Sequence, residues 1–553
     1  MNTRMPLGID DFAKARRNYY IVDKTDMIRR LLDGHGEVML FTRPRRFGKT
    51  LTMSMLDYFF SLRKKKEGAD LFRGMAVEKA GPAYMREQGK YPVIMLSLKD
   101  LKFLTWEDML DSFAGFMSRL YESFSEELSV LRGGAREYAS RVVYQKASLG
   151  DLTFSLARLT DFLSAYYGRA VILLIDEYDA PLQSAYAHGY YEECISFLRN
   201  FFSAALKSNP SLDFAVLTGV LRIAKESIFS GLNNVQAYSV LSREYSNVFG
   251  FTAEDIEKIA RDLQVPPEKR KEIKEWYDGY LFGGREMYNP WSVVSYIQHG
   301  CAAGPYWVNT SANEILQDLL PRADAARTKV LQDLLTGGTV KAAVREGVIY
   351  RDLAKEPGML YSLLLTTGYL TAAAGPLSMY NRYALRIPNK EVREAYSLEI
   401  LNHLSEGTDQ DSYAALFEAL LTGDGPSFKE ELSLILRSVV SAYDAAGKES
   451  FYHGFMLGMT ALFLGRNYTI ESNRESGYGR FDLAVFPKDS TKAGVLMEFK
   501  AADRKDALKA RAEDALRQIR DKQYGAAFEE RGIHTVWKYG IAFCGKQVEI
   551  CMK

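Results

Sequence analysis

The chain has 553 residues, of which 47% are hydrophobic and 25% are charged, the composition of an ordinary globular protein. Because one hydrophobic core seldom extends beyond about 300 residues, this length predicts roughly two to four domains. The 71 Lys and Arg residues balance 70 Asp and Glu residues, which excludes a uniformly basic protein, so any surface for nucleic acid must be local.

The four cysteines are scattered, with no CxxC pair and no zinc-type cluster with histidine, which disfavours disulfides and a structural metal. The N-terminus lacks the basic-then-apolar pattern of a signal peptide. No apolar stretch approaches the roughly 20 residues of a membrane span. These features predict a protein of a reducing cytoplasm that does not associate with a membrane.

Residues 1–230 alternate short apolar runs with amphipathic helical segments, the pattern of an α/β domain. Strands are predicted at 37–42, 91–98, 170–176 and 213–219, with helices between them such as 50–62 and 194–206. The run VILLI in the third strand is continuous, as expected for a strand of a parallel sheet that is buried on both faces.

Residues 231–440 are predicted to be a mostly helical region with aromatic and Gly/Pro clusters, densest in WYDGYLFGGREMYNPWSV at 276–293. An aromatic core beneath a turn is the simplest interpretation of most of these rings. Residues 441–553 predict a helix, three strands, a basic helix at 503–523 and a further strand. The last region is therefore expected to be a small separate α/β domain.

The stretch VMLFTRPRRFGKT at 38–50 ends an apolar run with Gly48-Lys49-Thr50, just before a predicted helix. A phosphate-binding loop needs backbone N–H groups at a helix N-terminus, a Lys for the β and γ phosphates, and a Ser or Thr for Mg²⁺. Lys49 and Thr50 stand in those places, but Arg43 replaces the first glycine. Alone, the stretch is equally well interpreted as a basic turn that begins a helix.

Two further strand ends favour a nucleotide site. Asp176 and Glu177 follow the third strand, where a carboxylate can hold Mg²⁺ through water and a following Glu can polarise the attacking water. A helix N-cap is the alternative for Asp176. Thr218 ends the fourth strand and Arg222 follows it, at the place for groups that sense the γ-phosphate. The three elements together predict binding of ATP and Mg²⁺.

Four stretches carry a resemblance to a known family, namely GIDDFAKARRNYYIVDKTDMIRRLL, FTRPRRFGKTLTMSML, LLIDEYDAPL and LTGVLRIAKESIFSGLNN. They resemble the AAA-ATPase-like family common in anaerobic and gut bacteria. In that family RPRRFGKT is the usual form of the phosphate loop, so the resemblance implies that the missing glycine is a family trait. Arg45 and Arg46 are hypothesised to supply charge where the loop supplies fewer amides.

The resemblance extends over most of the chain. Tyr20, Asp23 and Lys24 match the family's YVDKT element, for which the residues themselves indicate only a cap and turn before a helix. The block at 276–293 matches the family's WYDGY and YNPWS motifs, and the resemblance implies a lid or helical module behind an AAA-like P-loop ATPase domain.

A second constellation lies in GYGRFDLAVFPKDSTKAGVLMEFK. Alternation along a strand puts Glu498 and Lys500 on one face, and a hairpin would bring Asp482 to Glu498. Two carboxylates can hold a hard divalent cation, Mg²⁺ or Mn²⁺, with a lysine beside it, a set that suits phosphodiester hydrolysis. The alternative is an everyday solvated charge pattern on an edge strand.

The spacing D-x15-E-x-K resembles the PD-(D/E)XK nuclease superfamily, with Phe481 where a proline is expected. The resemblance implies a restriction-endonuclease-like α/β domain, with Gln518 on the following helix as a further catalytic residue and Tyr524 near it. The helix-borne acidic position of the superfamily stays open between Glu449, His453 and Glu475.

The helix after Lys500 carries Lys505, Lys509, Arg511, Arg517, Arg520 and Lys522, interleaved with Asp506, Glu513, Asp514 and Asp521. A local surface for a phosphate backbone and a solvated helix with charge pairs explain this pattern equally well.

We therefore expect a cytoplasmic bacterial protein that couples an ATPase to a metal-dependent nuclease acting on nucleic acid, with DNA favoured as the substrate. One alternative is an ATP-dependent switch or scaffold whose C-terminal domain binds nucleic acid or protein without cleaving it, and another is a nuclease that binds ATP without turnover. The architecture is compatible with mobile-element or phage-defence biology by analogy only. Homo-oligomerisation stays open, as does the choice among Arg43, Arg45, Arg46 and Arg222 for charge near the γ-phosphate.

Overall fold

The computed structural model describes residues 3–34, 36–222, 228, 233–307, 330, 334, 337–347, 357–376, 381–396, 410–439, 452–453, 455–456, 459–460, 468–476, 479–522, 524 and 526–553. The chain forms two compact units, Met1–Ser311 with Thr339–Glu391, and Ala312–Gly338 with Val392–Lys553. Within these described stretches, every helix is too short or too polar to cross a membrane.

The first unit is built on a five-stranded parallel sheet in the order β2-β3-β4-β1-β5. Its strands are β1 (Val38–Thr42), β2 (Val93–Ser97), β3 (Val171–Asp176), β4 (Leu212–Gly219) and β5 (Val235–Tyr238). The four predicted strands are confirmed. The edge strand β5 was not predicted, because its sequence VQAY is only half-buried and gives no continuous apolar run.

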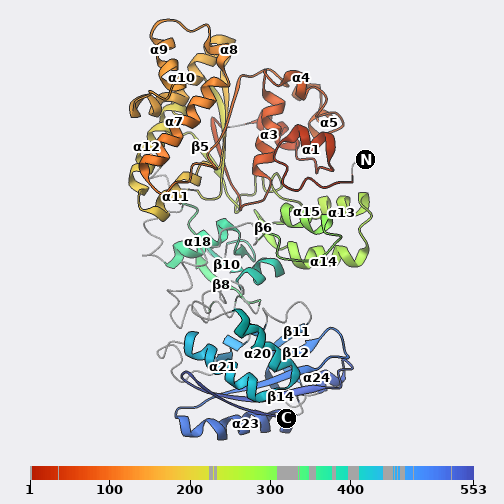
Figure 1. The fold of residues 1–553 in the computed structure, drawn as a ribbon. Helices are drawn as coiled ribbons and strands as arrows, with labels where there is room; N and C mark the ends of the chain where they lie inside the picture. The colour runs from red at the N-terminus through yellow and green to blue at the C-terminus, as the bar shows by residue number, and fades with distance from the viewer. Residues whose placement is uncertain are drawn as a thin grey trace. The chain divides into compact units, whose positions relative to one another are not determined.

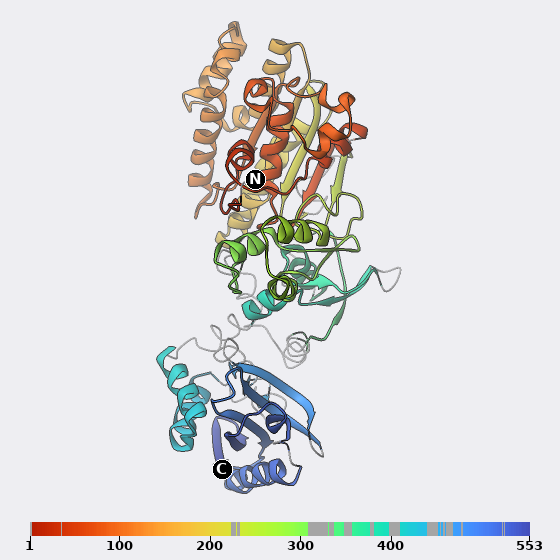
Figure 2. The ribbon, with the colours of Figure 1, turned by 90° about the vertical axis from the view of Figure 1, so that its right-hand side faces the viewer.

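Helices cover both faces of this sheet, which is why β1 and β3 are buried along their whole length. Helix α3 (Lys49–Phe60) lies on one face, and α7 (Trp106–Glu122), α10 (Leu149–Tyr167) and α12 (Tyr191–Leu206) lie on the other (Figures 1 and 2). The remaining helices here are α1 (Phe12–Asn18), α2 (Asp26–Asp33), α4 (Lys65–Gly68), α5 (Ala76–Lys79), α6 (Pro82–Met85), α8 (Ser125–Leu128), α9 (Gly133–Val143) and α11 (Ala180–His188).

Much of the middle region folds with the first unit and is not wholly helical. Its elements are α13 (Ala253–Asp262), α14 (Pro267–Tyr277), β6 (Tyr280–Phe282), β7 (Arg285–Met287), α15 (Pro290–Gln298), β8 (Val340–Ala343), α18 (Pro357–Thr367), β9 (Thr371–Ala372) and β10 (Arg382–Arg386). Strands β8, β9 and β10 form a small antiparallel sheet, and β6 pairs with β7.

The predicted boundary at residue 230 therefore differs from the compact units. The reason is packing of the block at 276–293 beneath the loop that joins β1 to α3. The ring of Phe47 lies 5.1 Å from that of Tyr280 and 5.2 Å from that of Phe282. The backbone N–H of Gly250 donates to the Phe47 carbonyl at 3.2 Å. As expected, Tyr277 and Tyr288 lie in an aromatic core, whereas Trp291 lines a cavity.

The second unit contains a mixed five-stranded sheet in the order β11-β12-β13-β14-β15. Its elements are α20 (Gln410–Thr422), α21 (Gly425–Val439), β11 (Tyr468–Ser476), β12 (Gly479–Pro487), β13 (Gly494–Ala501), the 3-10 turn η4 (Lys505–Ala507), α23 (Leu508–Asp521), α24 (Ala526–Glu529), β14 (Val536–Cys544) and β15 (Gln547–Met552). Only β13 and β14 pair in parallel.

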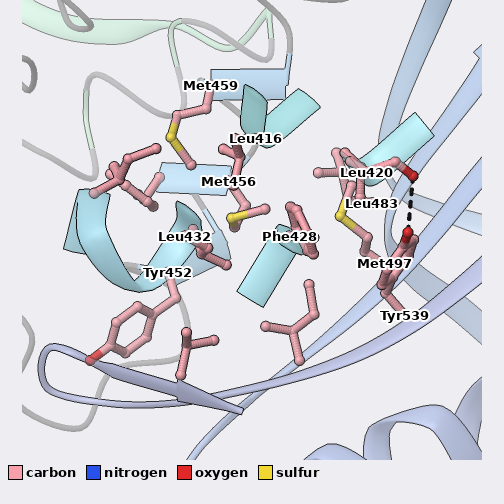
Figure 3. Close-up of a cluster of buried hydrophobic side chains, with 14 of the residues drawn as sticks. Leu416, Leu420, Phe428, Leu432, Tyr452, Met456, Met459, Leu483, Met497 and Tyr539 are labelled. Atoms are coloured by element: carbon pink, nitrogen blue, oxygen red, sulfur yellow. Dashed lines mark hydrogen bonds between the residues drawn. The ribbon is translucent and has the colours of Figure 1, made fainter. Parts of the chain in front are cut away.

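Helices α20 and α21 belong to the core of this sheet, so the predicted boundary at residue 440 also differs from the structure. Leu416, Leu420, Phe428 and Leu432 pack with Met497 and Tyr539 of the strands (Figure 3). The hydroxyl of Tyr539 donates to the Leu420 carbonyl at 3.0 Å, the dashed line in Figure 3. The α/β domain therefore includes α20 and α21, which lie on its sheet face opposite α23.

A glycine sets how closely α23 approaches the sheet. Gly540 of β14 pairs with Glu498 of β13. A Cβ atom at Gly540 would collide with the backbone oxygen of Ala512 and the backbone nitrogen of Leu516, both in α23. Only glycine lets the helix lie this close beside Glu498.

We predict that Gly540→Ala lowers the stability of the chain by about 1–3 kcal/mol, because α23 must move away from β14. The midpoint of thermal unfolding of the full chain measures the change. Gly134→Ala is the matched control, since Gly134 lies exposed in α9 with open space around its Cβ position. This control should leave the midpoint unchanged or raise it slightly, and equal midpoints for the two variants would contradict the prediction.

Candidate functional sites

The loop from β1 to α3 has the geometry of a phosphate-binding turn. Gly48 precedes the helix with a φ of +83°, in the left-handed region that glycine favours. Lys49, buried at the first turn of the helix, donates from Nζ to the carbonyl oxygens of Arg43 at 3.0 Å and Pro44 at 2.9 Å. Burial lowers the pKa of Lys49, and the nearby carboxylates of Glu177 and Asp176 partly offset this effect.

Arg43, which replaces the first glycine, points into the protein and away from any phosphate position. Its side chain is 0% exposed, and its guanidinium donates to the carbonyls of Thr42, Tyr238 and Tyr245 at 2.8–3.1 Å. The rings of Phe249 and Phe282 lie 5.6 and 5.5 Å from it. Burial lowers the pKa of Arg43 to about 9. Arg43 therefore ties β1 to β5, which removes it from the candidates for charge near the γ-phosphate.

Asp176, at the end of β3, draws two hydroxyl side chains together. It is 0% exposed and accepts a hydrogen bond from Thr50 Oγ1 at 2.7 Å and another from Thr218 Oγ1. Thr50 belongs to α3 and Thr218 to β4, so the three elements that sequence reasoning brought together do meet here. Hydroxyl and carboxylate oxygens are ligands that Mg²⁺ prefers, and this donor set fits that ion.

Glu177 faces a cavity that begins at the phosphate loop. Its φ of +51° is unusual for a residue other than glycine. Burial raises its pKa, while the charge of Lys49 acts in the opposite direction. The cavity has a volume of about 500 Å³ and is lined by Glu177, Arg45, Arg46, Gly48, Lys49 and Thr50, and also by Tyr20, Ile21, Phe251, Trp291 and Val294.

The other predicted arginines are each engaged with a different partner. Arg45 donates to Gln183 Oε1 at 2.9 Å, and the guanidinium of Arg46 stacks 4.1 Å above the ring of Trp291. Arg222 lies 3.4 Å from Glu346 in an ion pair and is not among the residues that line the cavity. The structure thus brings Arg45 and Arg46 to the cavity, whereas Arg222 lies apart from it.

Two residues that sequence reasoning missed hold the segment after β4. Asp179 accepts the backbone N–H groups of Val220 at 3.1 Å and Leu221 at 2.8 Å. The hydroxyl of Tyr178 donates to the Leu221 carbonyl at 2.7 Å. Gly219 is required here, because a Cβ atom would collide with both side chains. The signal in the sequence was the pair Tyr178-Asp179 directly after Glu177, together with a glycine at the end of the neighbouring strand.

The YVDKT element has a structural role. The backbone N–H of Thr25 donates a hydrogen bond of 2.9 Å to Asp23 Oδ1. This contact forms the predicted cap and turn before α2. Lys24 Nζ donates to Asp255 at 2.6 Å, and Tyr20 donates to Asp262 at 2.8 Å. The element therefore connects the sheet domain to α13.

In the second unit, Asp482 and Glu498 are neighbours across β12 and β13. The register pairs Leu483 with Met497, and the next position brings Asp482 opposite Glu498. Ladder pairing stops there, and Asp482 Oδ2 accepts the backbone N–H of Phe499 at 2.7 Å instead. As the alternation predicted, Phe499 packs in the core on one face, while Lys500 Nζ lies 3.6 Å from Glu498 Oε1.

Glu498 is buried with one oxygen unsatisfied. Its Oε1 accepts from Gln518 Nε2, and the same amide nitrogen lies 3.4 Å from the hydroxyl of Tyr524. Its Oε2 is buried and has no hydrogen-bond partner among the described residues. Burial and the charge of Asp482 raise the pKa of Glu498 to about 8, against the opposing charge of Lys500. An orphaned carboxylate oxygen beside a second carboxylate fits a divalent cation.

Of the three candidates for the helix-borne acidic position, the structure describes only the side chain of His453. His453 lies close, but its Nε2 contacts the backbone oxygen of Asp482 at 2.9 Å. Glu449 lies outside the described residues, as does the side chain of Glu475. Among the residues that are described, no group of three or more His, Cys, Asp or Glu side chains gathers as a metal site.

The basic helix presents its charges to solvent. α23 buries Leu508, Ala512, Ala515, Leu516 and Ile519 against the sheet. Arg517 pairs with Asp514 at 3.1 Å, one turn away on the same helix. Such pairing agrees with a solvated helix, on which Lys509 and Arg520 are also exposed.

Comparison with known proteins finds a family match in the N-terminal part of the chain and another in the C-terminal part. Residues 6–229 match the family described as "Predicted AAA-ATPase", and residues 447–553 match the PD-(D/E)XK nuclease superfamily. The chain carries an AAA-ATPase-like domain and a PD-(D/E)XK nuclease-superfamily domain. The resemblance expected from the motifs and the α/β fold class are thereby confirmed.

One similar protein is an "Uncharacterized protein in vnfD 5'region" of Azotobacter chroococcum mcd 1. It is 28% identical over 536 residues, which are 96% of this chain and 94% of that protein. Among solved structures, the Aeropyrum pernix ORC2 protein aligns over 71% of this chain and 99% of its own, with 13% identity and a TM-score of 0.26.

We predict that Arg43→Gly, which restores the glycine of ordinary phosphate loops, destabilises the AAA-ATPase-like domain. Loss of three hydrogen bonds and the cavity left behind should cost about 2–4 kcal/mol in free energy of unfolding. Chemical denaturation monitored by circular dichroism measures this change. Arg45→Ala is the control and should cost less than about 0.5 kcal/mol. A glycine variant as stable as the wild type would show that the buried guanidinium is dispensable.

The raised pKa of Glu498 predicts that metal binding displaces a proton. Below a pH of about 8 the metal-free carboxyl is mostly protonated, so affinity for Mn²⁺ should rise by up to about tenfold per pH unit and level off above pH 8. Titration of the full chain with Mn²⁺, followed by electron paramagnetic resonance at several pH values, measures the slope. Glu498→Gln should remove this slope together with most of the affinity. A pH-independent affinity in the wild type would contradict the prediction.

Proposed function

We propose that the chain couples binding and hydrolysis of ATP to metal-dependent cleavage of nucleic acid. Both domain types are present. The nuclease half of the proposal depends on one observation: the Oε2 atom of Glu498, next to Asp482, is buried and has no hydrogen-bond partner in the part of the chain that the structure describes. A native protein retains such an unsatisfied group at a cost, and a bound divalent cation would remove that cost.

At the proposed nuclease site, Asp482 and Glu498 would hold Mg²⁺ or Mn²⁺, which supplies an acidified water and stabilises charge on the scissile phosphate. Lys500 would position the nucleophile or neutralise charge on that phosphate, since its ammonium already lies 3.6 Å from Glu498. Gln518 would orient Glu498 through its amide, and Tyr524 supports Gln518 in turn. DNA is the favoured substrate.

At the proposed ATPase site, Lys49 would exchange its hydrogen bonds with the Arg43 and Pro44 carbonyls for the β and γ phosphates. Backbone N–H groups at the start of α3 converge on the same place. Thr50 and Asp176 would hold Mg²⁺, and Glu177 would take a proton from the attacking water. Thr218 reaches this centre through its hydrogen bond to Asp176. The base and ribose would enter the cavity that Ile21 and Phe251 help to line.

The nuclease half predicts that cleavage of DNA by the full chain requires metal and Lys500. Linear, circular and single-stranded DNA and single-stranded RNA are each incubated with Mg²⁺ or Mn²⁺, with and without ATP. Lys500→Ala should lower the cleavage rate by about 10²-fold or more, because it removes charge stabilisation at the phosphate. Lys492→Ala, which removes an exposed lysine from the loop between β12 and β13, should stay within about twofold. Equal cleavage by the wild type and the Lys500 variant would identify a contaminating nuclease.

The ATPase half predicts that Glu177→Gln binds ATP but hydrolyses it about 10²-fold more slowly, because the general base is lost. Release of inorganic phosphate measures turnover, and a fluorescent ATP analogue measures binding. If Glu177→Gln still cleaves nucleic acid in the presence of ATP, then binding of ATP, without its hydrolysis, is enough to support cleavage. ATP hydrolysis without cleavage of any substrate would favour an ATP-dependent switch or scaffold.

A further inference from the structure

Among the residues that the structure describes, the arginines that the sequence offered for the terminal phosphate of ATP all have other partners. Hydrolysis of ATP builds charge on that phosphate, and P-loop enzymes meet it with a cation besides the loop lysine. In this chain Arg43 is buried against carbonyls, Arg45 contacts Gln183, Arg46 stacks on Trp291 and Arg222 pairs with Glu346. The arginines that the sequence offered are therefore either turned away from the cavity or already engaged.

The loop after β2 begins beside the catalytic edge of the sheet. Ser97, the last residue of β2, pairs with Asp176 in the parallel ladder. The backbone N–H of Leu98 then donates to the Asp176 carbonyl at 3.0 Å. Because β2 and β3 are neighbours and run in the same direction, the residues that follow Ser97 must emerge next to Glu177.

This loop is anchored at both ends, so its position is set by the fold. Leu98 and Leu101 are buried and joined by a backbone hydrogen bond of 3.1 Å. The carbonyl of Phe103 accepts from Ser184 Oγ at 3.1 Å and from the hydroxyl of Tyr190 at 2.8 Å. A turn held in this way presents the side chains between its anchors with little conformational freedom of the backbone.

Lys99, Asp100 and Lys102 of this loop line the same cavity as Thr50 and Glu177. Lys99 forms an ion pair with Asp10 at 4.0 Å. Lys102 has neither a hydrogen bond nor an ion pair with any residue that the structure describes, and it is exposed. The charge of Lys102 also acts on Glu177, where it lowers the pKa against the effect of burial.

We propose that Lys102 is a catalytic residue that contacts the terminal phosphate of ATP from within the same chain, in the place that a neighbouring subunit's arginine fills in other ATPases. The proposal rests on the proposed hydrolysis of ATP. Lysine suits this position because its ammonium is a compact charge on a flexible stem that can reach from the loop.

In the reaction, the oxygen of water forms a bond to the γ-phosphorus, and Glu177 accepts the proton released from that water. The bond between the γ-phosphorus and its bridging oxygen breaks, and the electron pair stays on the β-phosphate of ADP. Lys102 keeps its proton throughout and balances the charge that the three non-bridging oxygens share.

Steady-state ATP hydrolysis by the full chain tests the proposal with three variants. Lys102→Ala should lower kcat by about 10²-fold with less than about threefold change in KM, as expected for a contact made in the transition state. The kcat of Lys102→Arg should be at least about tenfold higher than that of Lys102→Ala. Lys146→Ala, which removes an exposed lysine between α9 and α10, is the control and should match the wild type. A loss seen with Lys99→Ala and absent with Lys102→Ala would assign the cation to Lys99 and overturn the proposal.

Mixing two inactive variants distinguishes a cation within the chain from one supplied by another copy. Lys49→Ala lacks the phosphate-binding lysine but retains Lys102, and Lys102→Ala retains Lys49. If Lys102 acts within its own chain, the mixture stays as slow as the sum of its parts. Recovery of hydrolysis in the mixture would show action between chains and overturn the proposal.

The outcomes also separate this proposal from the proposed function. Wild-type hydrolysis that Glu177→Gln abolishes and Lys102→Ala leaves intact would overturn the role of Lys102 and leave the ATPase standing. A raised KM with unchanged kcat in Lys102→Ala would overturn the catalytic role, because it reduces Lys102 to a ground-state contact. Wild-type phosphate release no faster than that of Glu177→Gln would overturn both.

Discussion

The carboxylate of Asp176 is the interaction on which the first unit depends. It is fully buried at the end of β3 and draws a hydroxyl from α3 and a hydroxyl from β4 to the same point. Leaving the oxygens of a buried carboxylate unsatisfied costs several kcal/mol. Moving α3 or β4 away would break these hydrogen bonds and incur that cost, so the carboxylate stabilises the positions of both elements. The helix that follows the phosphate loop and the fourth strand thus meet at one centre.

Arg43 shows how a phosphate loop can do without its first glycine. Glycine usually serves such loops by allowing an unusual backbone conformation or a close approach of the ligand. In this loop Arg46 and Gly48 adopt positive φ values, whereas Arg43 does not, so a residue with a side chain fits at position 43 without strain. Its side chain points backward into the sheet and ties the loop to β5 through the Tyr238 carbonyl. The arginine therefore supports the loop from within the protein.

The predictable part of the molecule consists of features that local pattern alone determines. Continuous apolar runs predicted the positions of β1 to β4. The residue types of Lys49, Thr50, Asp176 and Glu498 indicated which chemistry to expect, and the fold brings Thr50 to Asp176 and Glu498 to Asp482. The side-chain direction of Arg43 could not be predicted, because residue type gives a charge and not its partners. The position of Lys102 was equally hidden, since it follows from the pairing of β2 with β3 and no motif marks it.

The compact units differ from the predicted boundaries for a related reason. Composition changes near residues 230 and 440, but packing does not follow composition: Phe47 needs Tyr280 and Phe282 to bury its ring, and α20 needs Tyr539 to satisfy the carbonyl of Leu420. Such contacts join segments more than a hundred residues apart, where periodicity carries no information.

The two sites use the same device, a glycine that permits close approach next to a buried acid. Gly219 leaves room for Tyr178 and Asp179 beside the edge of the sheet that holds Asp176. Gly540 leaves room for α23, which carries Gln518 to Glu498 on the adjacent strand. In each case strand register places the acid. The neighbouring group, which is Tyr178 and Asp179 in the first site and α23 in the second, is placed by how closely it can pack against the glycine. A side chain on either glycine would displace the neighbouring group and leave the acid in place. The arrangement of side chains at both sites is therefore more sensitive to packing around the glycine than to the position of the acid.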